Sequence, residues 1–263
     1  MEIIEPSVKL EAITQLVKND SIQTGLNVEK VIEKAGRTCY LSSDKITPDS
    51  ADKFVDNIVN VKHHESIAEH CSATFRIITD RGVLAEITRH RLASYSVEST
   101  RYVAYTKDKK GMQFILPSWM DKRFCGHYKT SYGEHSVACI ELDEAKIELF
   151  KELSTASGYN EIHPTSTSCI GEEPCSDWLL SAAEDELRYN RLIEKGWTPQ
   201  QARAVLPNCL KTEIVMTANF REWLHFLELR TSPQAHPDMQ VIAKMIGNKL
   251  HEVSPVIFKK ECC

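Results

Sequence analysis

The 263-residue chain lacks several features that would place it in a membrane, secreted or nucleic-acid-binding class. No apolar run approaches the roughly 20 residues that a membrane-spanning helix needs. The first residues, MEIIEPSVKL, contain no basic segment followed by an apolar one, so we expect no signal peptide. The net charge is -5 at pH 7, whereas a general nucleic-acid binder usually has a basic face. We therefore expect a cytoplasmic protein that binds neither membrane nor nucleic acid.

Cysteine is present, but in no arrangement that indicates disulfides or a metal site. The nine cysteines are odd in number and scattered, and no C-x-x-C pair occurs. Histidines and carboxylates gather in HHESIAEH (63–70), but Ala68 stands where the H-E-x-x-H metal motif needs its second histidine. We therefore expect reduced thiols and no bound metal.

No repeat, low-complexity tract or Gly/Ser linker divides the chain, so we expect a single domain over residues 1–263. Residue type and alternation predict strands over 71–79 and 209–218. Apolar spacing predicts helices over 27–40, 47–64, 83–91, 136–156, 176–196, 198–207, 219–230 and 238–253. Asn27 is the expected N-cap of the helix at 27–40, and Asn219 and Glu222 have capping-box spacing at the helix over 219–230. The polar segment 157–176 is expected to be a loop, either a surface insertion or a functional segment.

Positive side chains gather in one short stretch, RHRLASYSVESTRY (89–102), although the chain as a whole is acidic. If residues 83–91 are helical, Glu86, Arg89 and His90 share one face. The serine-rich segment that follows favours turns, so several donors converge where a helix meets a hydroxyl-rich loop. Guanidinium groups bind phosphate with paired hydrogen bonds. The stretch is therefore either a site for a small phosphorylated ligand or a solvated basic patch, and a nucleic-acid-binding module is the rival function.

A second polar group lies on the expected helix over 219–230. Arg221, His225 and Glu228 follow one another at i, i+4 and i+7, and the other side of the helix is apolar. Arg230 lies in the last turn, where a cation interacts favourably with the helix dipole. Taken singly, these charges are explained equally well as ordinary surface residues.

Taken together, four motifs occur in the order typical of one family. They are RHR followed by seven residues and Ser99, HHESIAEH, ARAVLP (202–207) and TANFREWLHFLELR (217–230). In these motifs the chain resembles the flavin-dependent thymidylate synthases. The resemblance implies an α+β fold of the thymidylate synthase-complementing type, with a mainly antiparallel sheet flanked by helices. It also implies a homotetramer whose active sites are shared between subunits.

The resemblance implies an enzyme that methylates C5 of dUMP to give dTMP. Methylenetetrahydrofolate supplies the one-carbon unit, and NADPH supplies reducing equivalents through bound FAD. The positions that match flavin-contacting residues are His64, Ser66, Arg89, His90, Arg91, Val97, Asn219, Arg221 and His225. The positions that match residues around dUMP are Glu86, Arg89, Glu98, Ser99, Thr100, Arg101, Arg203 and Arg230. Relatives often carry Asn-Glu where this chain has Ser96-Val97, and the glutamate here falls one position later, at Glu98.

Two of these residues raise a question of catalytic role. Arg230 matches an arginine beside the uracil, where a fixed guanidinium stabilises charge at N3 and O4 without transferring a proton. We therefore expect Arg230 to be the catalytic residue. Ser99 is either a covalent nucleophile or a hydrogen-bond donor to the nucleotide. A serine nucleophile needs an activating base, and no histidine is placed by sequence to serve, so we expect the hydrogen bond.

Overall fold

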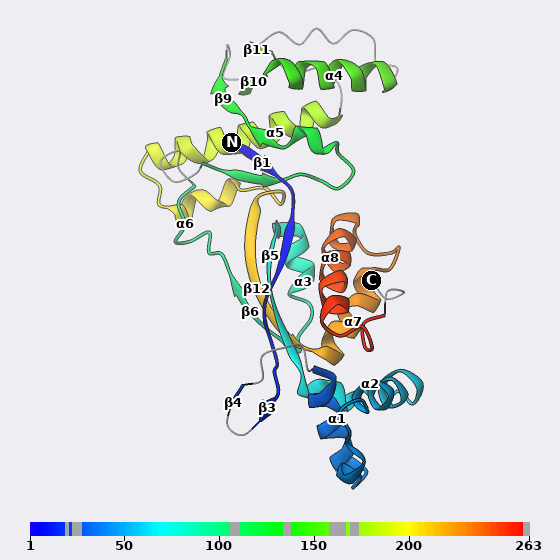
Figure 1. Cartoon of the computed structure of the whole chain (residues 1–263). Helices are drawn as coiled ribbons and strands as arrows, with labels where there is room; N and C mark the ends of the chain where they lie inside the picture. Colours follow the sequence, from blue (N-terminus) through cyan, green and yellow to red (C-terminus); the bar gives the residue numbers. More distant parts are fainter. Residues whose placement is uncertain are drawn as a thin grey trace. The chain divides into compact units, whose positions relative to one another are not determined.

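The computed structural model describes residues 1–18, 21–22, 28–105, 111–133, 138–157, 167–168 and 174–259. The chain folds into helices and mainly antiparallel strands, which confirms the predicted α+β class (Figure 1). Contacts along the chain define two compact units. Unit 1 comprises Met1–Pro6, Thr79–Gly82 and Glu98–Thr212, and unit 2 comprises Ser7–Ile78, Val83–Val97 and Glu213–Cys263. A single domain over residues 1–263 stays a prediction.

A four-stranded sheet forms the centre of unit 2. Its order is β2-β5-β12-β6, from Ser7–Ile13, Ser72–Asp80, Lys211–Asn219 and Ala93–Val97. β2 is antiparallel to β5, and β6 is antiparallel to β12. Thr74 meets Thr217 and Arg76 meets Glu213, so β5 and β12 also run in opposite directions. The predicted strands at 71–79 and 209–218 are confirmed as β5 and β12.

Alternate residues of these strands enter one core, as the period of a strand requires. Buried apolar side chains of β5 and β12 pack with those of α7 (Phe220–Arg230) and α8 (Pro237–Val253). Trp223 of α7 is fully buried, its ring lies edge-on to Phe75, and its indole N–H donates to the carbonyl oxygen of Ala73 at 3.2 Å. α8 packs against α7 and β2. The helices therefore cover one face of the sheet, and Arg76 and Thr217 lie on the other.

The remaining elements of unit 2 surround this core. They are β3 (Val17–Lys18), β4 (Ser21–Ile22), α1 (Val28–Cys39), a 3₁₀ helix (Ser43–Lys45), α2 (Ala51–Val55), a π-helical segment (Asp56–Val61), a second 3₁₀ helix (Glu65–His70) and α3 (Arg81–Ile87), whose first two residues belong to unit 1. The helices predicted at 27–40, 219–230 and 238–253 are confirmed as α1, α7 and α8. The helix predicted at 47–64 is shorter and ends in the wider turns of the π-helical segment.

Unit 1 contains smaller sheets and its own core. In one sheet β1 (Glu2–Ile4) lies between β7 (Gln113–Ile115) and β8 (Gly126–His127), and in the other β10 (Ala138–Glu141) lies between β9 (Lys129–Tyr132) and β11 (Thr167–Ser168). Its helices are α4 (Glu144–Ser157), α5 (Pro174–Glu194) and α6 (Pro199–Ala202), which continues as a 3₁₀ helix (Arg203–Val205). The predicted loop at 157–176 lies mostly outside the described residues, as does the expected N-cap Asn27.

Two predictions along the chain were wrong in part. The helix expected at 136–156 begins only at Glu144, because residues 138–141 pair with β9 and β11 as a strand. The helix expected at 83–91 ends at Ile87, where bonds from Arg89 N to the Glu86 carbonyl oxygen and from His90 N to the Ile87 carbonyl oxygen tighten the chain. The turn expected after it is instead the edge strand β6, which pairs with β12. In both places, pairing with other strands overrides the local pattern.

Candidate active site

Four polar residues of unit 2 form a continuous chain of contacts, which we call the Arg230 network. It consists of Glu86 at the end of α3, His90 in the turn after it, and Glu222 and Arg230 on α7. The Arg230 guanidinium donates to the Glu86 carboxylate at 3.0 Å, to the Glu86 carbonyl oxygen at 3.1 Å and to His90 Nε2 at 3.1 Å. His90 Nδ1 lies 3.0 Å from a Glu222 carboxylate oxygen. Arg230 therefore has a fixed orientation, which a mobile helix-end cation would lack.

His90 is neutral in this arrangement. An arginine Nε–H can only donate, so His90 Nε2 accepts, and the ring proton lies on Nδ1 and faces Glu222. Burial lowers the pKa of His90, and the charge of Arg230 lowers it further, against the opposing effect of Glu222. The direction of the pKa shift and the geometry therefore agree on an uncharged imidazole.

Local packing holds His90 in place. The ring lies against Phe226 and edge-on to His225, with centroid distances of 4.8 and 5.8 Å. The Tyr95 hydroxyl of β6 donates to the carbonyl oxygens of Ile87 and His90, which fixes the backbone of the turn. As a result His90 is only 5% exposed, and both of its ring nitrogens are engaged within the protein. Its predicted contact with flavin stays a prediction.

The arginines on either side of His90 face outward. Arg89 and Arg91 are exposed, and neither guanidinium has an ion-pair or hydrogen-bond partner within the part of the chain that the structure describes. Leu92, the next residue, is 73% exposed. Unpaired guanidinium groups beside an exposed apolar side chain suit a ligand that carries both phosphate and an apolar ring.

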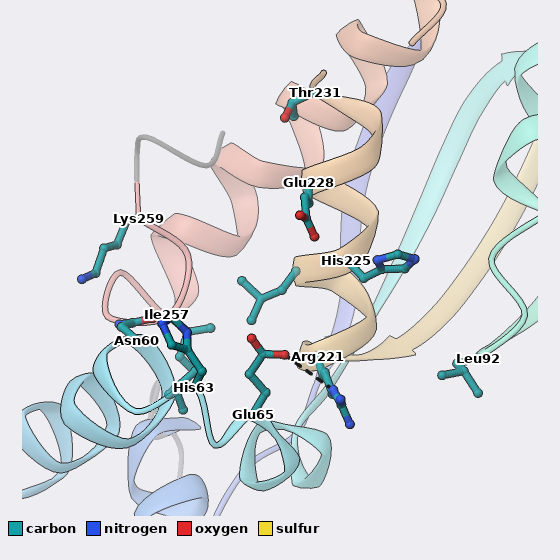
Figure 2. A pocket seen from close by; sticks show the side chains of 12 residues that line it. Asn60, His63, Glu65, Leu92, Arg221, His225, Glu228, Thr231, Ile257 and Lys259 are labelled. Carbon is teal, nitrogen blue, oxygen red and sulfur yellow. Dashed lines mark ion pairs between the residues drawn. The ribbon is translucent and has the colours of Figure 1, made fainter. Parts of the chain in front are cut away.

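A pocket of about 910 Å³ opens along α7 beside this turn. Figure 2 shows Arg221, His225 and Glu228 on successive turns of α7, with Glu65 facing Arg221. Arg221 forms ion pairs with Glu69 at 2.6 Å and with Glu65 at 3.6 Å. The full lining is Val59, Asn60, His63, Glu65, Leu92, Arg221, Leu224, His225, Glu228, Thr231, Ile257 and Lys259. The volume lies within the roughly 300–1,000 Å³ of small-molecule sites.

The other predicted flavin positions are not among the residues that line this pocket. His64 Nδ1 is 2.8 Å from the Tyr40 hydroxyl, and Ser66 is exposed on the 3₁₀ helix. The side-chain oxygen of Asn219 caps α7 by accepting from Glu222 N at 2.9 Å, as predicted. Val97 ends β6 opposite Ile214.

Four predicted dUMP positions lie in one segment of unit 1. Ser99 Oγ accepts from Arg101 N at 3.3 Å, Thr100 is buried, and Arg101 Nε lies 3.4 Å from Gln200 Oε1. Glu98 accepts from the Tyr105 hydroxyl at 3.0 Å and from Lys211 Nζ at 2.6 Å. The Glu98 carboxylate is therefore already engaged by protein donors. Arg203, the remaining position in unit 1, is exposed on the 3₁₀ helix after α6.

Several residues of the site escaped sequence reasoning. Glu222 has the spacing of a helix-cap partner, but its carboxylate is directed to His90 instead. His63 is the first residue of the HHESIAEH motif and Leu92 directly follows RHR, so their positions in the motifs were the available signal. His63 also has φ 56°, a left-handed conformation uncommon outside glycine, which turns the chain into the pocket. Lys259 lies far from every motif in the sequence, so nothing in the sequence indicated that it lines the pocket.

The fold and these clusters define an α+β protein with outward-facing guanidinium groups, a half-buried arginine network and a pocket of the size that small-molecule ligands occupy. Residues 22–256 match the family model described as thymidylate synthase complementing protein. The chain belongs to this family, and the resemblance in its motifs is confirmed.

Curated relatives agree with this assignment. The flavin-dependent thymidylate synthase of Corynebacterium aurimucosum is 30% identical over 233 residues, which cover 88% of this chain and 78% of the relative. The enzyme of the same name from Corynebacterium glutamicum is 28% identical over 265 residues, covering 98% and 90%. The crystal structure of flavin-dependent thymidylate synthase ThyX from Helicobacter pylori, complexed with FAD and dUMP, matches with a TM-score of 0.63 at 21% identity. That match covers 98% of this chain and 99% of the other, so the fold is shared.

No helix within the described ranges has the length and apolar character that crossing a membrane requires.

Proposed function

We propose that this protein is a flavin-dependent thymidylate synthase. It converts dUMP to dTMP with methylenetetrahydrofolate as one-carbon donor and NADPH as reductant, acting through FAD. The observation that carries the proposal is the held orientation of Arg230 in a chain of this family. The curated relatives bear the same enzyme name, and the Helicobacter pylori structure contains FAD and dUMP.

Arg230 is the proposed catalytic residue. A guanidinium has five N–H donors, and Glu86 and His90 accept from three of them. The two that remain have no acceptor among the described residues and can face a pyrimidine. A donor pair at uracil O4 and N3 stabilises negative charge there, which increases the electron density at C5. Such preorganised stabilisation contributes about 2–4 kcal/mol to lowering a barrier.

The residues of unit 2 fit FAD as the bound cofactor. FAD, when bound, carries reducing equivalents from NADPH to the one-carbon unit. Arg89 and Arg91 offer its phosphates guanidinium groups that have no partner among the described residues, and Arg221 and His225 line a pocket of adequate volume. The proposed flavin-binding set is completed by His64, Ser66, His90, Val97 and Asn219.

The proposed dUMP contacts come from both units. Arg101 and Arg203 supply cations for the nucleotide phosphate, and Ser99 supplies a hydroxyl for a hydrogen bond. The proposed set is completed by Glu86, Arg89, Glu98, Thr100 and Arg230. We further infer a cytoplasmic homotetramer with active sites shared between subunits. Arg89 and Arg91 are exposed and have no partner within the described ranges, which supports the binding of another subunit or of a ligand beside the pocket.

The test is a dTMP-formation assay in which FAD, NADPH, methylenetetrahydrofolate and dUMP are omitted one at a time. Product should require all four. Arg230→Ala and Arg230→Lys should both reduce turnover by roughly 30- to 1,000-fold, since lysine keeps the charge but loses the planar fork.

Flavin content and melting temperature, measured on the same samples, separate catalysis from folding. An Arg230→Ala protein that turns over within a few-fold of wild type would make Arg230 a structural cation. Product formed in the absence of FAD would remove the flavin-dependent mechanism altogether.

A further inference from the structure

Glu222 is a buried carboxylate for which neither the motifs nor the proposed reaction has a role. It lies in the first turn of α7, eight residues before Arg230, and is 6% exposed. Its backbone N–H completes the helix cap with Asn219, but its carboxylate is directed away from the cap. A buried carboxylate costs stability unless it is paired and hydrogen-bonded. Its partner at 3.0 Å is His90, which is buried as well.

This pair determines which nitrogen of His90 carries the proton. The ionised carboxylate of Glu222 can only accept, so Nδ1 must be the protonated nitrogen. Nε2 is then left as an acceptor, and that is what Arg230 Nε–H requires at 3.1 Å. Without Glu222, the imidazole can carry its proton on Nε2 instead. In that tautomer two donors face each other, and the contact with Arg230 is lost.

We propose that Glu222 is a positioning residue, which acts through His90 to hold the Arg230 guanidinium in the orientation that faces the substrate. The inference rests on the proposed function, because it assumes that Arg230 is the catalytic group. His90 and Glu222 are 132 positions apart in the sequence, so the pair links the turn after α3 to the start of α7. Glu86 holds the other side of the guanidinium.

A pH dependence follows from the groups that face His90. These are Glu222, His225 and Arg230 on α7, Glu86 on α3 through its ion pair with Arg230, and Tyr95 on β6. Protonated His90 carries an N–H on both nitrogens, so acid breaks the contact with Arg230 and turnover falls. Loss of the Glu222 charge removes an effect that raises the pKa of His90. A neutral acceptor at this position should therefore move the acidic limb of the rate profile to lower pH.

The experiment compares Glu222→Gln with Glu222→Ala. Glutamine keeps an acceptor for Nδ1–H, so kcat should stay within a few-fold of wild type, while the acidic limb moves to lower pH. Alanine removes the acceptor, so kcat should fall roughly tenfold or more, the size of effect seen when a group that orients a metal-binding histidine is removed. The KM for dUMP should change much less than kcat.

Glu29→Ala is the matched control. Glu29 is another buried carboxylate of unit 2, and it accepts from the Ser254 hydroxyl at 2.7 Å. It reports the general cost of removing a buried carboxylate, which should appear in the melting temperature and leave kcat per folded enzyme unchanged. A Glu222→Ala enzyme with the kcat of the Glu29→Ala enzyme would overturn the proposal. So would a Glu222→Gln enzyme that loses as much kcat as the alanine variant, or whose acidic limb stays in place.

A measurement independent of turnover keeps the two hypotheses apart. In ¹⁵N spectra of histidine-labelled protein, the signals that disappear in His90→Gln belong to His90. They should show the Nδ1–H tautomer in wild type and Glu222→Gln, and lose it in Glu222→Ala. A wild-type protein that forms no dTMP would contradict the proposed function, whereas an active enzyme with an Nε2–H tautomer at His90 would contradict only the positioning role.

Discussion

At the scale of single residues, the cations of this site fall into two kinds. Arg230 is held by Glu86 and His90, whereas Arg89 and Arg91 have no partner among the residues that the structure describes. Because the Arg230 guanidinium is already held in place, little further entropy is lost when charge develops beside it, and this suits a catalytic role. The guanidinium groups of Arg89 and Arg91 can become ordered when a ligand binds to them, and this suits a binding role.

Arg91→Ala tests the binding role. A charged hydrogen bond to a phosphate contributes about 1.5–3 kcal/mol, so the Kd of the flavin-free protein for FAD should rise by roughly 10- to 150-fold. Fluorescence titration with FAD measures this.

Arg76→Ala provides the control for the loss of one positive charge. Arg76 lies on the other face of the sheet, where it pairs with Glu11 and Glu213. Its removal should leave flavin affinity nearly unchanged. If both substitutions weakened FAD binding equally, Arg91 would contribute only through the net charge of the protein.

At the scale of elements, α7 carries much of the site because its sequence divides cleanly into faces. Phe220, Trp223 and Phe226 are fully buried, while Arg221 and His225 line the pocket. Helical spacing alone produces this division, since residues three or four apart lie on one side. The start of the helix is fixed by Asn219, which is the last residue of β12, so no loop separates the strand from the helix. A rigid strand-to-helix junction therefore sets where both ends of the helix lie.

Substitutions at Asn219, the N-cap of α7, should distinguish its effect on stability from its effect on FAD binding. Asn219→Ala should lower the free energy of unfolding of the flavin-free protein by about 1 kcal/mol, because Glu222 N loses its acceptor. Asn219→Asp keeps a capping oxygen and should unfold like wild type, but it lacks the amide N–H donors. If those donors bind flavin, FAD affinity should fall in both variants. Denaturant unfolding and FAD titration give the two readouts, and an aspartate variant with full FAD affinity would limit Asn219 to capping.

At the scale of the whole molecule, the chain consists of two units with separate cores. The Arg230 network and the α7 pocket belong to unit 2, and four predicted dUMP positions lie in one segment of unit 1. In a homotetramer with shared sites, residues of one unit can form a site together with residues of another copy of the chain.

Light scattering should therefore give a mass of about four times the 29.9 kDa chain, with flavin bound in the same peak. Mixing inactive Arg230→Ala with inactive Arg203→Ala tests whether sites are shared. Co-refolded tetramers should regain part of the activity, because some sites then contain both Arg230 from one kind of subunit and Arg203 from the other. An active monomer, or a mixture with no recovery, would contradict the shared-site assembly.

The sequence by itself determined the features that depend on near neighbours. Alternation of apolar residues in β5 and β12 and the period of α7 and α8 follow from local geometry, and so does the Asn219 cap. The four motifs also identified the family, because residues that must contact the same ligands keep a recognisable spacing.

Only the tertiary structure decided the features that depend on contacts between separate elements. Residues 138–141 became a strand because β9 and β11 supply their hydrogen bonds, and residues 93–97 became one because of β12. The role of Glu222 was likewise hidden, since its spacing to Asn219 indicates a helix cap, and nothing in the local pattern points to His90. A carboxylate pairs with whichever buried donor the fold brings within reach, and that donor came from 132 positions away.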